Sequence, residues 1–180
     1  MSAGRLIAVV GPSGVGKDSL INGILNRNKS LHRVQRVITR SPELNDEPFT
    51  HMTEAEFKSA ILADEFCLHW GAHGLYYGVP QAVLGEVRTG SQCVLNLSRN
   101  SLQTAQSIFP KITVLSITAS PETLAQRLQH RGRESFDGIT ERLSRTTSPL
   151  PAGLEVNEIS NDSTLIEAVE DCLQVLDQPY

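Results

Sequence analysis

The sequence has only three cysteines, no excess of positive charge and no long hydrophobic segment near its N-terminus. Cys67, Cys93 and Cys172 are too widely spaced for a disulfide framework or a metal-ligand motif, so we expect reduced and mostly buried thiols. The formal net charge of -4 argues against a general nucleic-acid-binding protein. The absence of a long apolar segment before Gly11, together with Ser2, argues against a signal peptide, a membrane span and myristoylation. We therefore expect a cytoplasmic protein that binds neither nucleic acid nor a membrane.

Hydrophobic residues make up 39% of the 180 residues, which is enough for one folded domain with a sizeable core. In the second half of the chain, strand-like apolar runs alternate with helix-like patterns. This alternation predicts an α/β fold in which a parallel sheet is flanked by helices. The predicted strands are residues 6–10, 34–39, 66–70, 93–97, 112–118 and 156–160. Predicted helices cover residues 17–26, 101–109 and 164–176, and a capping box at residues 53–56 predicts the start of a further helix.

Residues 11–18 form the most specific motif of the sequence, Gly-Pro-Ser-Gly-Val-Gly-Lys-Asp. The motif follows an apolar run at residues 6–10 and precedes a helical pattern, and this context is typical of a phosphate-binding P-loop. The glycines allow backbone shapes whose N–H groups surround an anion, and the start of the helix adds partial positive charge. We therefore predict nucleotide binding by Gly11, Pro12, Ser13, Gly14, Val15, Gly16, Lys17, Asp18 and Ser19, with Lys17 on the outer phosphates.

Asp18 stands where most P-loops have a Ser or Thr whose hydroxyl ligates Mg²⁺. One interpretation is that its carboxylate takes over this role, because Mg²⁺ prefers hard oxygen ligands. The other is that it only interacts favourably with the positive end of the helix dipole. The P-loop therefore predicts a bound nucleotide phosphate together with Mg²⁺, and Asp18 is the candidate metal ligand.

Five arginines lie between residues 127 and 145 of an otherwise acidic chain. Phosphoryl transfer needs cations that close over the migrating group and exclude water. Gly132 and Gly138 can act as hinges for such a closure, whereas a solvated basic helix face is the alternative. We predict an Arg-rich lid at residues 131–142, in which Arg131, Arg133 and Arg142 are catalytic.

Together with Thr39-Arg40, Tyr76-Tyr77-Gly78 and Asn161-Asp162, these motifs resemble the guanylate kinase branch of the nucleoside monophosphate kinases. The resemblance implies a P-loop fold with a parallel five-stranded sheet, an inserted acceptor-binding subdomain and an Arg-rich lid. It implies one domain over residues 1–180, with a core at 1–33 and 80–180 and the insert at 34–79. It also implies that Arg40 contacts the acceptor phosphate, and that Arg127 and Asn161 contact ATP.

The positions that read guanine in guanylate kinases differ in this chain. Glu43 replaces an arginine, His69 replaces an acid, and Val79 replaces a serine or threonine. A site that leaves the guanine N–H donors unpaired discriminates against guanine by about 10⁴-fold or more. The strand after the insert lacks its two usual acids, because Asn96 and Ser98 occupy their positions.

This combination is similar to the ribose 1,5-bisphosphate phosphokinases of phosphonate catabolism, and the similar segments are residues 11–20, 38–40, 70–78, 96–99 and 131–134. The similarity implies transfer of the ATP γ-phosphoryl group to ribose 1,5-bisphosphate, which gives 5-phosphoribosyl diphosphate. A nucleoside monophosphate kinase and a non-catalytic module are the alternatives, and the intact Lys17 argues against the module. The expected acceptor-binding residues are Thr39, Arg40, His51, His69, Tyr77, Asn96, Ser98 and Arg99, although an ordinary surface histidine is an equally good interpretation of His51.

Overall fold

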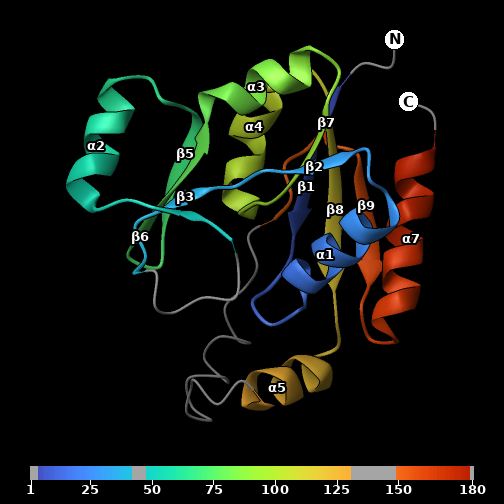
Figure 1. Ribbon diagram of the computed structural model, residues 1–180. Coiled ribbons are helices and arrows are strands. Elements are labelled where there is room, and N and C mark those ends of the chain that lie inside the picture. Colours follow the sequence, from blue (N-terminus) through green and yellow to red (C-terminus); the bar gives the residue numbers. More distant parts are fainter. Residues whose placement is uncertain (1–3, 42–47, 131–148, 179–180) are drawn as a thin grey trace. The chain divides into compact units, whose positions relative to one another are not determined.

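The computed structural model of the chain describes residues 4–41, 48–130 and 149–178 (Figure 1). The main sheet has five strands in the order β2-β7-β1-β8-β9. Its two outer pairs, β2 with β7 and β8 with β9, are parallel. The prediction of a parallel five-stranded sheet flanked by helices is therefore confirmed. In sheet order, the strands are Leu31–Arg33 (β2), Gln92–Asn96 (β7), Arg5–Val10 (β1), Ile112–Thr118 (β8) and Val156–Ser160 (β9).

The chain divides into two compact units, and the first comprises Met1–Ile7, Ser30–Leu95 and Ser101–Ile112. This unit contains a second sheet of four strands in the order β4-β3-β6-β5. Strand β3 runs parallel to β4 and antiparallel to β6, and β6 also pairs with β5 in a hairpin. Its elements are β3 (Val37–Ile38), β4 (Thr50–His51), α2 (Glu54–Leu62), β5 (Phe66–Ala72), β6 (Leu75–Pro80), α3 (Gln81–Arg88) and α4 (Leu102–Ile108).

Helix α2 begins at a capping box in which the Thr53 side chain accepts from the Glu56 backbone and the Glu56 carboxylate accepts from the Thr53 backbone. The pattern Thr-x-x-Glu predicts this start, because the two side chains satisfy N–H groups that the helix leaves unpaired. The helix buries Phe57 completely, and its ring stacks on Phe66 at 4.7 Å and on Tyr76 at 5.7 Å between centroids. These contacts attach α2 to the β5–β6 hairpin.

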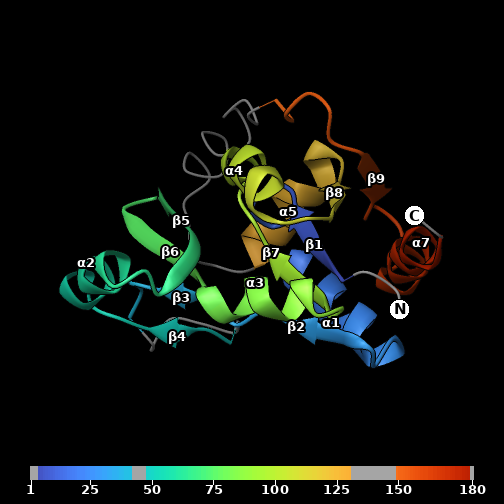
Figure 2. The same cartoon turned by 90° about the horizontal axis from the view of Figure 1, so that it is seen from above.

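The second unit comprises Ala8–Lys29, Asn96–Asn100 and Thr113–Tyr180, and its helices are α1 (Lys17–Arg27), α5 (Pro121–His130) and α7 (Leu165–Asp177). Helices α1 and α7 lie side by side (Figures 1 and 2). A Cβ atom on Gly23 of α1 would lie 2.4 Å from Val169 Cγ2 of α7, so a residue without a side chain is required for this close approach. Among the described residues, no helix is long and apolar enough to cross a lipid bilayer.

The structure differs from the sequence prediction around residues 34–39. The strand-like segment there is shared between two sheets: Val34 N donates to Val94 O beside β7, whereas Val37 pairs with Gly78 of β6. Strand β6 and the short strands β2 and β4 were not predicted. Short apolar runs show that a strand is possible, but they do not show which strand is its partner.

Candidate active site

The P-loop joins the fully buried strand β1 to helix α1, as predicted. Gly11 has φ 155°, and a Cβ atom there would lie 2.6 Å from the carbonyl oxygen of Ile117. Gly16 caps α1 in the left-handed conformation at φ 95°, and a Cβ atom there would lie 2.8 Å from Asn161 Nδ2. Side chains at these two positions would strain the loop and push away its neighbours. The glycine spacing of the motif therefore has a direct steric reason.

The Lys17 ammonium lies over its own loop. Its Nζ donates to the backbone carbonyls of Gly11 at 2.8 Å and Pro12 at 3.0 Å. A lysine held at this place can reach the phosphates that a P-loop binds. Ser13 is exposed at the tip of the loop, while the side chain of Val15 is completely buried.

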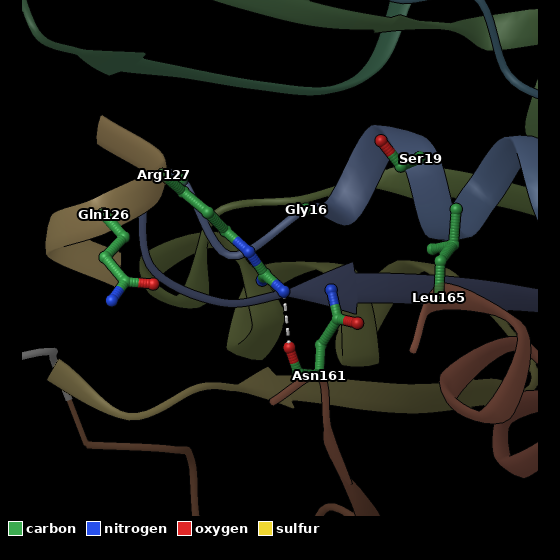
Figure 3. Close-up of a pocket in the computed structure, with 7 residues that line it drawn as sticks. Gly16, Ser19, Gln126, Arg127, Asn161 and Leu165 are labelled. Carbon is green, nitrogen blue, oxygen red and sulfur yellow. Dashed lines mark hydrogen bonds between the residues drawn. The ribbon is translucent and has the colours of Figure 1, made fainter. Parts of the chain in front are cut away.

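Two side chains from the C-terminal half of the chain donate hydrogen bonds to the backbone of the P-loop. Asn161 Nδ2 donates to Val15 O at 2.8 Å, and Arg127 donates to the same oxygen at 3.1 Å. The second amino group of Arg127 donates to Asn161 O at 2.8 Å (Figure 3). The neighbouring Asp162 accepts from Ser120 N at 2.8 Å, just before α5 begins. The loop before α7 therefore connects the P-loop to the start of α5.

A pocket of about 520 Å³ lies beside this part of the P-loop (Figure 3). Its volume is within the range of small-molecule sites. The lining residues come from the P-loop, α1, α5 and the start of α7, and they are Gly14, Gly16, Ser19, Gln126, Arg127, Asn161 and Leu165. Five of the predicted nucleotide-binding residues thus line one pocket, namely Gly14, Gly16, Ser19, Arg127 and Asn161.

Asp18 is half-buried in the first turn of α1, and its Oδ1 accepts a hydrogen bond of 3.5 Å from Asn96 Nδ2. Within the described part of the chain, no group of three or more His, Cys, Asp or Glu residues could hold a metal ion. Mg²⁺ in kinases is usually held by one or two carboxylates, by substrate phosphates and by water. The Asp18 carboxylate, next to Lys17 of the P-loop, could serve as one such ligand for an ion held in that way.

Thr39, Arg40, His51 and Tyr77 lie on or directly after strands β3, β4 and β6 of the four-stranded sheet in the first unit. Thr39 pairs with Tyr76, donating to its carbonyl oxygen at 3.1 Å and accepting from its N–H through Oγ1 at 2.9 Å. The His51 ring nitrogen Nδ1 lies 2.6 Å from Arg40 O. Tyr77 stacks almost parallel on Trp70, with 5.3 Å between the ring centroids. His69 is exposed on β5, paired with Gly78 in the register of the hairpin.

Asn96, Ser98 and Arg99 follow one another at the end of β7, in the second unit. The proposed lid residues Arg131, Arg133 and Arg142 lie outside the described residues, as does Glu43. Arg36 was not among the predicted site residues. It is only 6% exposed, and its guanidinium lies 5.4 Å from the centroid of the Tyr77 ring. The sequence signal for this residue was a charged side chain inside the strand-like segment 34–38, because a buried arginine needs a specific partner.

The cysteines are free, as expected, with Cys93 and Cys172 buried and Cys67 half-buried. Burial raises the pKa of the Cys93 thiol to about 12, and the adjacent Glu86 carboxylate adds to this rise. Burial also raises the pKa of Cys172 to about 12, with a contribution from Asp171. Both thiols are therefore neutral near pH 7 and are poor nucleophiles.

Comparison with known proteins identifies the family. The family model described as guanylate kinase matches residues 3–178. The chain belongs to the guanylate kinase family. A solved guanylate kinase from Anaplasma phagocytophilum shares this fold, with a TM-score of 0.73 at 19% identity over 97% of this chain and 85% of that one.

Within the guanylate kinase family, this chain is similar to proteins named ribose 1,5-bisphosphate phosphokinase. The one from Ruegeria sp. (strain TM1040) is 46% identical over 175 residues, which cover 96% of this chain and 92% of the relative. The one from Thiobacillus denitrificans is 38% identical over 98% of this chain and 94% of the relative. The resemblance stated from the sequence motifs is thus confirmed.

Proposed function

We propose that this protein is a kinase that transfers the γ-phosphoryl group of ATP to the C1 phosphate of ribose 1,5-bisphosphate. The products are 5-phosphoribosyl diphosphate and ADP. The proposal rests on the 46% identity to a kinase named for this substrate over nearly the full length of both chains. The P-loop with Lys17 supports it, because a phosphoryl donor has to be bound. We also propose that the protein acts in the cytoplasm, where ATP is supplied.

In this proposal, the P-loop binds the phosphates of ATP through its backbone N–H groups. Lys17 turns from the carbonyls of Gly11 and Pro12 towards the outer phosphates. The adenine lies in the pocket beside Arg127 and Asn161, whose volume and position next to the P-loop suit a nucleobase. Asp18 is the residue that would hold Mg²⁺, directly or through water, and the ion would neutralise phosphate charge there.

The acceptor phosphate is already ionised, so the protein needs no general base. An oxygen of the C1 phosphate attacks the γ phosphorus, and the bond from that phosphorus to the bridging oxygen breaks as ADP leaves. Positioning and charge neutralisation then account for catalysis. We propose that residues 34–79 bind the acceptor through Arg40, Thr39, His51, His69 and Tyr77, with Asn96 and Ser98 near the reacting phosphates. Arg131, Arg133 and Arg142 are proposed to close over the transferred group.

The test is coupled ADP release measured with ribose 1,5-bisphosphate, GMP and AMP under identical conditions. We expect fast turnover with ribose 1,5-bisphosphate only, and the product should be identified as 5-phosphoribosyl diphosphate. GMP turnover within about tenfold of that rate would reject the assignment, since a lost hydrogen-bonding pocket discriminates far more strongly than that. Such a result would instead favour a nucleoside monophosphate kinase, which the shared fold also permits.

A further inference from the structure

Arg99 follows β7 in the short 3-10 helix Arg99–Ser101, and the residue is half-buried. One amino group, NH2, donates to Ser116 Oγ of β8 at 3.2 Å. The Nε atom is buried and has no hydrogen-bond partner. Across residues 4–41, 48–130 and 149–178, no carboxylate forms an ion pair with this arginine.

Among the described residues, the half-buried guanidinium of Arg99 therefore has no carboxylate partner. Moving a guanidinium away from water costs free energy, and buried charges are normally paired with an opposite charge. Ser116 is 1% exposed and neutral, so it orients the guanidinium without balancing its charge. An arginine has five N–H donors, and Ser116 accepts only one of them. An anion that reaches the open side of Arg99 would supply the missing countercharge.

The residues just before Arg99 contact the strand and the helix that flank the P-loop. Leu97 N donates to Val9 O at 3.0 Å, which ties the end of β7 to the strand that leads into the P-loop. One residue earlier, Asn96 contacts Asp18 in the first turn of α1. Ligands of parallel α/β sheets bind at this edge, where the carboxyl ends of the strands meet. Arg99 also belongs to the same compact unit as the P-loop.

We propose that Arg99 binds phosphate oxygens of the acceptor at the phosphate that receives the transferred group, and that Ser116 is the positioning residue that holds its guanidinium. A guanidinium can present two parallel N–H groups to two phosphate oxygens, which a lysine cannot do. The identity of the acceptor rests on the proposed function, whereas the binding of a phosphate anion at Arg99 does not.

Calorimetric titration of the protein saturated with MgADP tests this assignment, because ADP occupies the P-loop and prevents phosphate from binding there. Ribose 1,5-bisphosphate is titrated into the wild type and into the Arg99→Gln, Arg99→Lys and Arg88→Gln variants. Arg88 is exposed at the end of α3, so Arg88→Gln removes the same charge from the surface. We expect Arg99→Gln to weaken acceptor binding by about 10- to 100-fold, the effect of losing charge-assisted hydrogen bonds. Arg99→Lys should weaken it less, and Arg88→Gln should leave it unchanged, as should ATP affinity in all three variants.

The Ser116→Ala variant shows whether Arg99 binds the substrate or has a purely structural role. If Arg99 only braced β8, Arg99→Gln and Ser116→Ala would lower the melting temperature alike and leave acceptor affinity unchanged, and this outcome would overturn the proposal. We expect Ser116→Ala to weaken acceptor binding by a smaller factor than Arg99→Gln. Should Arg99→Gln not fold, equal acceptor affinities of Arg99→Lys and wild type would reject the site.

The same experiment distinguishes this inference from the proposed function. If the wild type does not bind ribose 1,5-bisphosphate, the proposed function fails, and inorganic phosphate becomes the probe for the MgADP-loaded protein. Phosphate binding that is lost in Arg99→Gln but kept in Arg88→Gln would support the anion site. Equal phosphate binding by Arg99→Gln and wild type would overturn it.

Discussion

The side-chain amide of Asn161 donates a 2.8 Å hydrogen bond to the backbone carbonyl of Val15, 146 positions away in the chain. Arg127 donates to the same oxygen and to the Asn161 carbonyl. The P-loop is therefore supported by side chains from the end of β9 and from α5, in addition to its own glycine conformations. Such support should preorganise the loop and so reduce the ordering that nucleotide binding requires.

We predict that Asn161→Ala weakens ATP binding and lowers stability. Loss of the buried hydrogen bond should decrease the free energy of unfolding by about 1 kcal/mol and leave the P-loop less ordered. Calorimetric ATP affinity and the thermal midpoint measure the two effects. Asn157→Ala is the matched control, because Asn157 Nδ2 donates to Val114 O at 3.4 Å in the sheet and has no P-loop contact. Equal ATP affinities of the two variants would contradict the supporting role of Asn161.

We predict that Lys17→Ala decreases kcat by about 10²- to 10³-fold, the effect of removing one preorganised charge from the transition state. The folded state should be little affected, since the ammonium donates to two carbonyls of its own loop, at Gly11 and Pro12. Steady-state kinetics and the thermal midpoint test this expectation. Lys29→Ala, at an exposed lysine after α1, should behave like the wild type. Near-normal turnover in Lys17→Ala would remove the P-loop from the mechanism.

We predict that Asp18→Asn raises the Mg²⁺ concentration needed for half-maximal rate severalfold. A carboxylate that holds Mg²⁺ should also strengthen MgADP binding relative to metal-free ADP, and calorimetry with and without Mg²⁺ measures this difference directly. Glu54→Gln is the control, because it removes an acid from the first turn of α2. If Asp18 only interacts with the helix dipole, both variants should lose about 0.3–1 kcal/mol of stability. Unchanged Mg²⁺ titrations in Asp18→Asn would then establish this simpler role.

We predict that Cys93 and Cys172 resist alkylation in the native protein at pH 8. Their pKa values of about 12 keep both thiols neutral, whereas unfolded cysteines ionise near pH 8.5. This difference contributes stability below pH 8.5 that is lost progressively as the pH rises towards 12, because the unfolded thiols ionise first. Mass spectrometry after iodoacetamide treatment should show modification of these residues only after unfolding. Rapid native alkylation of either thiol would contradict the burial argument.

Local sequence patterns predicted the parts of this protein whose structure depends on near neighbours. The P-loop follows from the glycine spacing around Lys17, since backbone conformation and the helix start are local properties. The start of α2 follows from Thr53 and Glu56, three residues apart. Strands β8 and β9 occupy the predicted ranges because continuous apolar runs suit buried parallel strands.

Only the tertiary structure decided how distant residues meet. Nothing in the local sequence shows that Asn161 supports Val15, that Arg99 reaches Ser116, or that Arg36 is buried against Tyr77. It also could not show that the run at 34–39 divides between two sheets. These contacts depend on which strands pair and in which register, and many pairings of short apolar strands satisfy the same local pattern. The full set of packing interactions selects one of them, and the residues around the P-loop are arranged by that choice.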